Sequence, residues 1–213
     1  MKKYELLVDD TITFFGVQLF RIKALISFSG IEKGEVGGYI ASEKNLSQYG
    51  DAWVYGNARV YGNAEVYGDA EVYDDAWVSD NARVSDNARV YGNAWVYDNA
   101  EVYGDAEVYG DAEVYDNARV YGNAEVYDNA EVYGDARVSD NADYIVFKNT
   151  WSSGRYFTYT KSNRKWRVGC FYGSGAELVE KAYKDSKKSG DFYKAYVDFV
   201  EKLEAIEDIH KEQ

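Results

Sequence analysis

Small and aliphatic residues recur every six positions through the middle of the chain. Every sixth residue from Ala52 to Ala142 is Ala, and every sixth residue from Val54 to Val138 is Val. Because Ala and Val are two positions apart, both point to the same side of an extended segment, and the residue between them points to the other side. Each unit continues with residues such as Tyr, Gly and Asn that are typical of corners. The pattern predicts a very short strand and a turn in every unit, stacked as a β-helix.

This repeat resembles that of hexapeptide-repeat proteins, with Val at the aliphatic inward position and Ala at the small one. The resemblance implies a mainly β fold, a single-stranded left-handed parallel β-helix in which three units complete one coil. The repeat then gives about five coils, or six if two degenerate units beginning near Ile40 and Leu46 are included. Each coil pairs only with its neighbours, so both ends of the stack need a cap. We therefore expect the solenoid to span residues 40–143.

Residues 1–39 read as an N-terminal β-hairpin cap. Thr11–Phe15 and Val17–Leu25 are rich in β-forming residues, and Gly16 lies between them. Four glycines then indicate a loop before the solenoid begins: Gly30, Gly34, Gly37 and Gly38.

Residues 144–213 break the repeat and read as a C-terminal α+β cap. Three stretches, DYIVFKNT, GRYFTYTKS and KWRVGCFYG, favour a three-stranded antiparallel meander with turns at 152–154 and 162–163. Ser174 and Glu177 have the spacing of a helix capping box. Residues 189–191 are expected to end this helix and to start a second one, whose apolar residues follow helical spacing.

Aromatic residues form columns on the solenoid surface because every third unit lies on the same face. Such columns have two interpretations. They stabilise the coil stack by cross-strand pairing, or they form a rigid aromatic surface for a partner, since exposed Tyr and Trp are frequent at interfaces. The candidate binding residues of the solenoid are Trp77 and Trp95 on one face and Tyr55, Tyr73, Tyr91, Tyr109 and Tyr127 at one corner.

Basic and aromatic residues alternate in the C-terminal segment. They could bind single-stranded nucleic acid by stacking and phosphate contacts, or hold a small anionic ligand such as a nucleotide at the seam with the solenoid. Alternatively, the aromatic residues form a core and the basic residues face the acidic solenoid. The candidate binding residues here are Trp151, Arg155, Arg164, Lys165, Trp166 and Arg167.

The charge is concentrated in the repeat. Residues 51–143 carry five Arg against twenty-one Asp and Glu, whereas the whole chain has a net charge of −13. Such a rod repels nucleic acid and anionic membranes and attracts basic partners. The single cysteine, Cys170, fits a reducing compartment, and the N-terminal sequence MKKYELLVDD lacks the apolar run of a signal peptide. We expect a location in the cytoplasm of a bacterial host, with no membrane association.

Catalytic chemistry of the usual kind has few candidate residues. The acyltransferases and carbonic anhydrases that share the hexapeptide repeat depend on histidines, and this chain has one, His210, near its end. The Asp residues of the repeat interchange with Asn at corners, as turn formation permits, and do not follow the nine-residue calcium-binding repeat. We therefore expect no enzymatic activity, no cofactor and no specific metal site.

The stretches EKGEVGGYIASEKNLSQYGDAWV, WSSGRYFTYT and WRVGCFYGS resemble a family of uncharacterised β-solenoid proteins of Firmicutes and their phages. The resemblance covers nearly the full length and implies a phage association, but no activity.

Three functions stay open. The first is a structural or protein-binding scaffold whose partner is a second copy, as a homodimer, or a basic, nucleic-acid-binding protein. The second is an acidic nucleic-acid mimic that inhibits a host nuclease or defence complex. Duplex DNA carries one charge per ~1.7 Å, so a duplex as long as the rod, roughly 25 Å, carries about 15 charges. This is close to the net charge of −16 on residues 51–143. The third is sequestration of a small anionic ligand at the seam.

Overall fold

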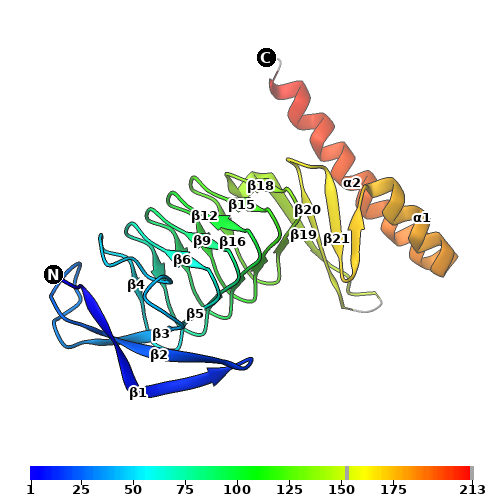
Figure 1. Cartoon of the computed structure of the whole chain (residues 1–213). Helices are drawn as coiled ribbons and strands as arrows, with labels where there is room; N and C mark the ends of the chain where they lie inside the picture. Colours follow the sequence, from blue (N-terminus) through cyan, green and yellow to red (C-terminus); the bar gives the residue numbers. More distant parts are fainter. Residues whose placement is uncertain (152–153, 212–213) are drawn as a thin grey trace. The chain divides into compact units, whose positions relative to one another are not determined.

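The computed structural model describes residues 1–151 and 154–211 of the chain (Figure 1). The chain forms two compact units, which are described separately. The first contains Met1–Val146 and Thr160–Asn163, and the second contains Phe147–Tyr159 and the described residues from Arg164 onward.

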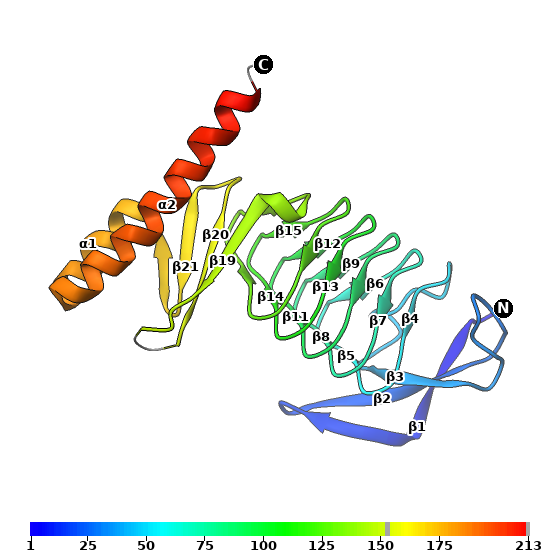
Figure 2. The ribbon, with the colours of Figure 1, turned by 180° about the vertical axis from the view of Figure 1, so that it is seen from behind.

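The repeat forms a β-solenoid of about six turns, as the six-residue period predicts (Figures 1 and 2). Each unit contributes one two-residue strand, and the strands lie on three faces named here after their first strand. The β4 face consists of β4 (Trp53–Val54), β7 (Glu71–Val72), β10 (Arg89–Val90), β13 (Glu107–Val108) and β16 (Glu125–Val126). The β5 face consists of β5 (Arg59–Val60), β8 (Trp77–Val78), β11 (Trp95–Val96), β14 (Glu113–Val114) and β17 (Glu131–Val132). The β6 face consists of β6 (Glu65–Val66), β9 (Arg83–Val84), β12 (Glu101–Val102), β15 (Arg119–Val120) and β18 (Arg137–Val138).

Neighbouring coils pair in parallel and in register. Trp77 lies against Trp95 and Val78 against Val96. The backbone N–H of Trp77 donates to the Ala94 carbonyl at 2.9 Å. The Val side chains from Val54 to Val138 and the Ala side chains from Ala52 to Ala136 point inward and are fully buried, whereas Ala142 is exposed. The interior is therefore an uninterrupted aliphatic column, and the backbone groups between coils satisfy one another.

Each corner depends on one residue with positive φ. At Asp98 φ is 57° and at Gly92 it is 70°, a conformation that Gly adopts freely and Asp tolerates. The Ala100 N–H then donates to the Tyr97 carbonyl at 3.2 Å and closes the turn. At Asp140 φ is −149°, and the chain leaves the coil through a short 3-10 helix, Asn141–Asp143.

The N-terminal hairpin consists of β1 (Tyr4–Phe14) and β2 (Val17–Ala24), with Gly16 in its turn as predicted. Next, β3 (Val36–Ile40) pairs with β2 and also with β5. The predicted loop is therefore partly wrong, because Gly37 and Gly38 lie in a strand. A Cβ on Gly37 would lie 2.5 Å from the Val54 carbonyl oxygen, so the missing side chain allows close packing.

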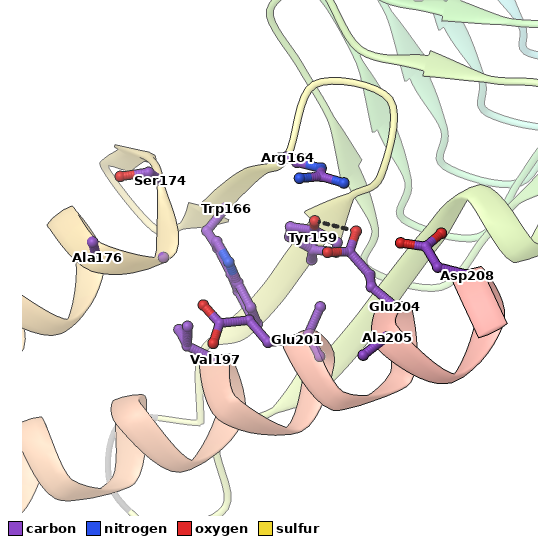
Figure 3. Close-up of a pocket in the computed structure, with 12 residues that line it drawn as sticks. Tyr159, Arg164, Trp166, Ser174, Ala176, Val197, Glu201, Glu204, Ala205 and Asp208 are labelled. Atoms are coloured by element: carbon purple, nitrogen blue, oxygen red, sulfur yellow. Dashed lines mark hydrogen bonds between the residues drawn. The ribbon is translucent and has the colours of Figure 1, made fainter.

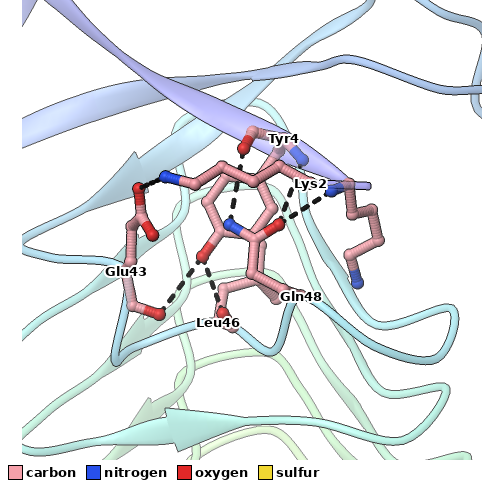
Figure 4. Close-up of polar contacts among 6 residues, drawn as sticks. Lys2, Tyr4, Glu43, Leu46 and Gln48 are labelled. Carbon is pink, nitrogen blue, oxygen red and sulfur yellow. Dashed lines mark hydrogen bonds and ion pairs between the residues drawn. The ribbon is translucent and has the colours of Figure 1, made fainter.

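Polar groups of the first residues fasten β1 to the start of the solenoid (Figure 4). The Tyr4 hydroxyl donates to the Leu46 carbonyl at 2.6 Å, and the Gln48 side chain accepts from the Lys3 N–H at 2.8 Å. The Lys3 Nζ donates to the Ala52 carbonyl at 2.8 Å, and burial lowers the pKa of Lys3 to about 8.

The C-terminal sheet has four strands within the described residues, in the order β19 (Tyr144–Lys148), β20 (Tyr156–Thr160), β21 (Lys165–Val168) and β22 (Phe171–Gly173). The three-stranded prediction missed one strand, because KWRVGCFYG forms both β21 and β22. Gly169 has a φ of 55°, which lets the chain reverse so that Val168 pairs with Phe171. Of the turn predicted at 152–154, residues 152 and 153 lie outside the described residues.

Two helices, α1 (Gly175–Asp185) and α2 (Lys187–Lys211), complete the second unit. The capping box is confirmed, since the Ser174 N–H donates to the Glu177 carboxylate at 2.7 Å. The predicted break at 189–191 is wrong, because these residues lie inside α2. A Cβ on Gly190 would lie 2.1 Å from Cδ1 of Tyr183, so this glycine serves close helix packing. Neither described helix has the apolar run required to cross a membrane.

The solenoid interior should tolerate little added volume. Ala64 is fully buried, and the adjacent Glu65 is exposed. We expect Ala64→Leu to lower the free energy of unfolding by about 1–3 kcal/mol through overpacking. The matched control Glu65→Leu should change it by less than about 0.5 kcal/mol. Guanidinium unfolding measures both, and equal losses would contradict the assigned inward and outward directions.

Candidate functional site

The β5 face carries stacked indoles. Trp77 and Trp95 lie on successive coils with ring centroids 4.5 Å apart and planes 10° apart. Arg59 precedes them in the same outward column and Glu113 follows. Trp95 retains 38% exposure, so the stack presents an aromatic surface.

The corner after the β4 face carries an unbroken tyrosine column. Tyr73, Tyr91 and Tyr109 stack nearly parallel, with ring centroids 4.7 and 4.9 Å apart. Tyr127 continues the stack at 5.4 Å, whereas Tyr55 meets Tyr73 edge to face. These five predicted residues therefore lie together, as the register requires.

Many phenols of the solenoid donate to a glutamate sixteen residues further along, on the next coil. The pairs are Tyr55–Glu71 at 3.0 Å, Tyr91–Glu107 at 2.8 Å, Tyr97–Glu113 at 3.1 Å, Tyr109–Glu125 at 3.0 Å and Tyr115–Glu131 at 3.1 Å. Desolvation and these hydrogen bonds raise the pKa values of Tyr55, Tyr91, Tyr97 and Tyr109, that of Tyr109 to about 12. The column at the β4 corner thus contributes to stability as well as to the surface.

Ser79 interrupts the tyrosine column at the next corner, after the β5 face. The column reads Tyr61, Ser79, Tyr97, Tyr115 and Tyr133. A cavity of about 260 Å³ lies at this position. Its lining consists of Phe15, Tyr61, Trp77, Ser79, Asp80, Trp95, Val96 and Tyr97. The cavity therefore combines aromatic walls with one carboxylate.

The tip of the N-terminal hairpin packs on this face. The Phe14 ring meets Trp77 edge to face at 4.4 Å, and Phe15 meets it at 5.6 Å while keeping 75% exposure. The Arg59 guanidinium lies 4.6 Å from the Phe14 ring centroid and 5.7 Å from that of Trp77. We call Phe15, Tyr61, Trp77, Trp95 and Tyr97 the aromatic patch.

Several of these residues were missed by reasoning from sequence. Ser79 had a visible signal, because it occupies a repeat position that is Tyr at the other units of its corner. Phe15 had none, because only the folded hairpin brings its tip onto the solenoid. Arg59 shares the outward column of Trp77 and Trp95 through the repeat, but its contact with Phe14 depends on the hairpin.

The predicted C-terminal residues do not converge. Trp166 is 2% exposed and packs against Tyr159 with ring centroids 5.1 Å apart. Arg164 and Trp166 line a cavity of about 520 Å³ (Figure 3), in which the Tyr159 hydroxyl donates to Glu204 at 2.6 Å. The other carboxylates lining it belong to Glu201 and Asp208. Three carboxylates and one guanidinium make this cavity a poor site for an anion.

The remaining candidates lie elsewhere in the second unit. Trp151 stacks on Phe192 at 4.1 Å. Arg155 lines a separate cavity of about 400 Å³. Lys165 and Arg167 alternate along β21 with Trp166 and Val168, which are buried. Because side chains alternate along a strand, the two cations lie on the side opposite the core.

Among residues 1–151 and 154–211, His, Cys, Asp and Glu form no group of three suited to a metal ion. His210 lies in the last turn of α2, and Cys170 is exposed between β21 and β22. Neither lies among the residues that line the aromatic cavity.

Comparison with known proteins agrees with the fold. Residues 52–68, 82–98 and 112–128 match the family described as YdcK β-solenoid repeat. The matches lie within the solenoid and cover its coils in part. No match to a curated protein was found. The chain is thus a β-solenoid protein with repeats similar to those of the YdcK family.

The tyrosine–glutamate bonds can be tested within one column. Tyr91→Phe removes the bond to Glu107 and keeps the stack, so we expect the free energy of unfolding to fall by about 0.5–1.5 kcal/mol. Tyr73→Phe is the matched control, because Tyr73 has Arg89 at the corresponding position. Denaturant unfolding would contradict the assignment if both variants lost the same amount.

The raised tyrosine pKa values predict alkaline unfolding. A free Tyr hydroxyl has a pKa of ~10, whereas the pKa of Tyr109 is about 12 in the folded chain. Above pH ~10 the unfolded chain releases protons that the folded chain retains, so stability is intact below that pH and falls as the pH rises. Circular dichroism and tyrosinate absorbance should change together above pH ~10. Complete tyrosinate formation with an unchanged circular dichroism spectrum would contradict this expectation.

Proposed function

We propose that this chain is a non-enzymatic, protein-binding scaffold, a rigid anionic solenoid that offers the aromatic patch to a basic protein. The exposed aromatic patch carries this proposal. Phe15 is 75% exposed and Trp95 is 38% exposed, although burial of either ring would be favourable. Exposed aromatic residues that lie together mark interaction sites.

The patch is held in place before any partner binds. Trp77 is stacked between the Arg59 guanidinium and Trp95, with the Phe14 ring edge against it. The backbone beneath it is fixed by hydrogen bonds between coils, such as that from Trp95 to Ala112 at 2.9 Å. Side chains that are already ordered lose little entropy on association, which favours binding.

Charge selects the class of partner. The repeat carries five Arg against twenty-one acidic residues, and Asp80 lines the cavity within the patch. Complementary potentials accelerate encounter and disfavour acidic partners. A basic protein, such as one that binds nucleic acid, matches both features.

The two alternatives have weaker support. A nucleic-acid mimic needs continuous negative charge, yet the outward column of the β6 face has three Arg and two Glu, with Arg119 bound to Glu101 at 3.0 Å. An anionic ligand is not favoured by the carboxylate-rich cavity of the second unit. Left-handed winding and a phage association rest on the family resemblance, and residence in the host cytoplasm rests on composition.

Native mass spectrometry of the protein isolated gently from the cells that make it tests this proposal. We expect a basic protein bound at fixed stoichiometry. The double variant Phe15→Ser, Trp95→Glu should lose it, because it removes the two exposed rings of the aromatic patch. The coil should accept Glu at position 95, since Glu occupies the same column at position 113. Tyr49→Ser, at an exposed tyrosine of a different corner, should keep it.

Three results would contradict the proposal. These are a homo-oligomer without another protein, a retained nucleotide in place of a protein, and equal retention of the partner by the double variant.

A further inference from the structure

We infer that the cavity at Ser79, called the gap below, binds one arginine side chain of a protein partner. This inference deepens the proposed function and rests on it for the identity of the partner, but the site itself can be tested without one.

The gap is the place of one missing ring. At the filled positions of the same column, Tyr97 and Tyr115 stack with centroids 4.7 Å apart and planes 5° apart. Successive coils are about 4.8 Å apart, so the Tyr61 and Tyr97 corners, two coils apart, are separated by roughly 9–10 Å. That separation leaves room for one flat group in the position that a tyrosine at residue 79 would take.

The backbone at this corner is the same as at the tyrosine corners. The Ser79 N–H donates to the Val96 carbonyl at 3.0 Å, and the Ala82 N–H donates to the Ser79 carbonyl at 3.1 Å. Asp80 has the positive φ of the repeat, 58°. Only the side chain differs, so the gap arises from the residue type and not from a distortion of the coil.

A second serine shows that the surroundings matter. Ser85 also replaces Tyr, at the next corner of the chain. Its neighbours in the outward column are Arg83 and Glu101, which form an ion pair at 3.8 Å. At Ser79 the corresponding neighbours are Trp77 and Trp95, and Phe15 from the hairpin tip adds a further aromatic wall.

The chemistry of the lining selects a guanidinium. This group is flat, weakly hydrated and stacks on aromatic rings, and it forms paired hydrogen bonds with carboxylates. Asp80 supplies the carboxylate, with Oδ2 accepting from the Ser79 hydroxyl at 3.0 Å. A neutral ring would fill the same space but give Asp80 no counter-charge, and a lysine ammonium is not flat.

The same face already holds one arginine in this manner. Arg59, one coil before Trp77, lies over the rings of both Phe14 and Trp77. Arginine from a partner would therefore repeat, at Ser79, a contact that the chain makes within itself. The excess of acidic residues in the repeat draws such a side chain toward the surface.

Nuclear magnetic resonance of the full chain with a defined probe tests the site. N-acetyl-argininamide is the probe, and its uncharged counterpart N-acetyl-citrullinamide is the comparison. We expect saturable shifts of the Trp77 and Trp95 indole N–H signals, with the citrulline compound binding at least roughly fivefold more weakly. The signal of Trp166, buried in the other unit, serves as the internal reference.

Two matched variants localise the binding. Ser79→Tyr restores the repeat residue and fills the gap, so binding should disappear while the unfolding curve is retained. Ser85→Tyr makes the same change at the neighbouring corner and should leave binding intact. Asp80→Asn tolerates the positive φ and should weaken the binding of the arginine probe.

The inference would be overturned if no probe gave saturable shifts, if citrulline or N-acetyl-tyrosinamide bound as tightly as arginine, or if Ser79→Tyr still bound. Failure of the proposed function is a separate result. Arginine binding without a basic partner in cells would refute the partner and keep the site. A partner that binds the aromatic patch equally well in Ser79→Tyr would refute the site alone.

Discussion

The in-register stacking of coils is the constraint on which the solenoid depends. Every surface residue lies against its counterpart eighteen positions along, so the side chains within each column must pack favourably against one another. Tyrosines stack, and the Asn81 amide donates to the Asn99 side chain at 3.1 Å. In the β6 column, Glu101 lies between two arginines and bonds Arg119 at 3.0 Å. The core meets the same condition with Val on Val and Ala on Ala.

That constraint also explains how a binding surface can arise without loss of the fold. Backbone hydrogen bonds between coils fix the corners whatever the side chain, as the regular bonds at Ser79 show. A change from Tyr to Ser therefore opens a cavity and leaves the coil in place. The surface around it is rigid because Trp77 and Trp95 are stacked, and rigidity lowers the entropy lost when a partner binds.

The second unit shows why alternation of aromatic and basic residues was ambiguous. On β21, Trp166 and Val168 are buried, and Trp166 lies near Val200 of α2 at the edge of one cavity. Lys165 and Arg167 point to the other side because neighbouring side chains of a strand diverge. The alternation that suggested a stacking surface for nucleic acid is thus also the pattern of a strand with one buried face. Trp151 and Arg155 contribute to different surroundings again.

Local chemistry determined a large part of this protein from sequence alone. The six-residue period specified short strands, the inward Val and Ala, the corners and the surface columns, and Ser174 with Glu177 specified a helix start, because these features involve residues near in sequence or related by the repeat. Tertiary structure alone decided the position of Phe15 on Trp77 and the contact of the Phe14 ring with Arg59. It also decided that Gly37 lies in a strand and Gly190 in a helix, where a side chain would collide with another element. Such contacts join segments with no shared period, so no local pattern records them.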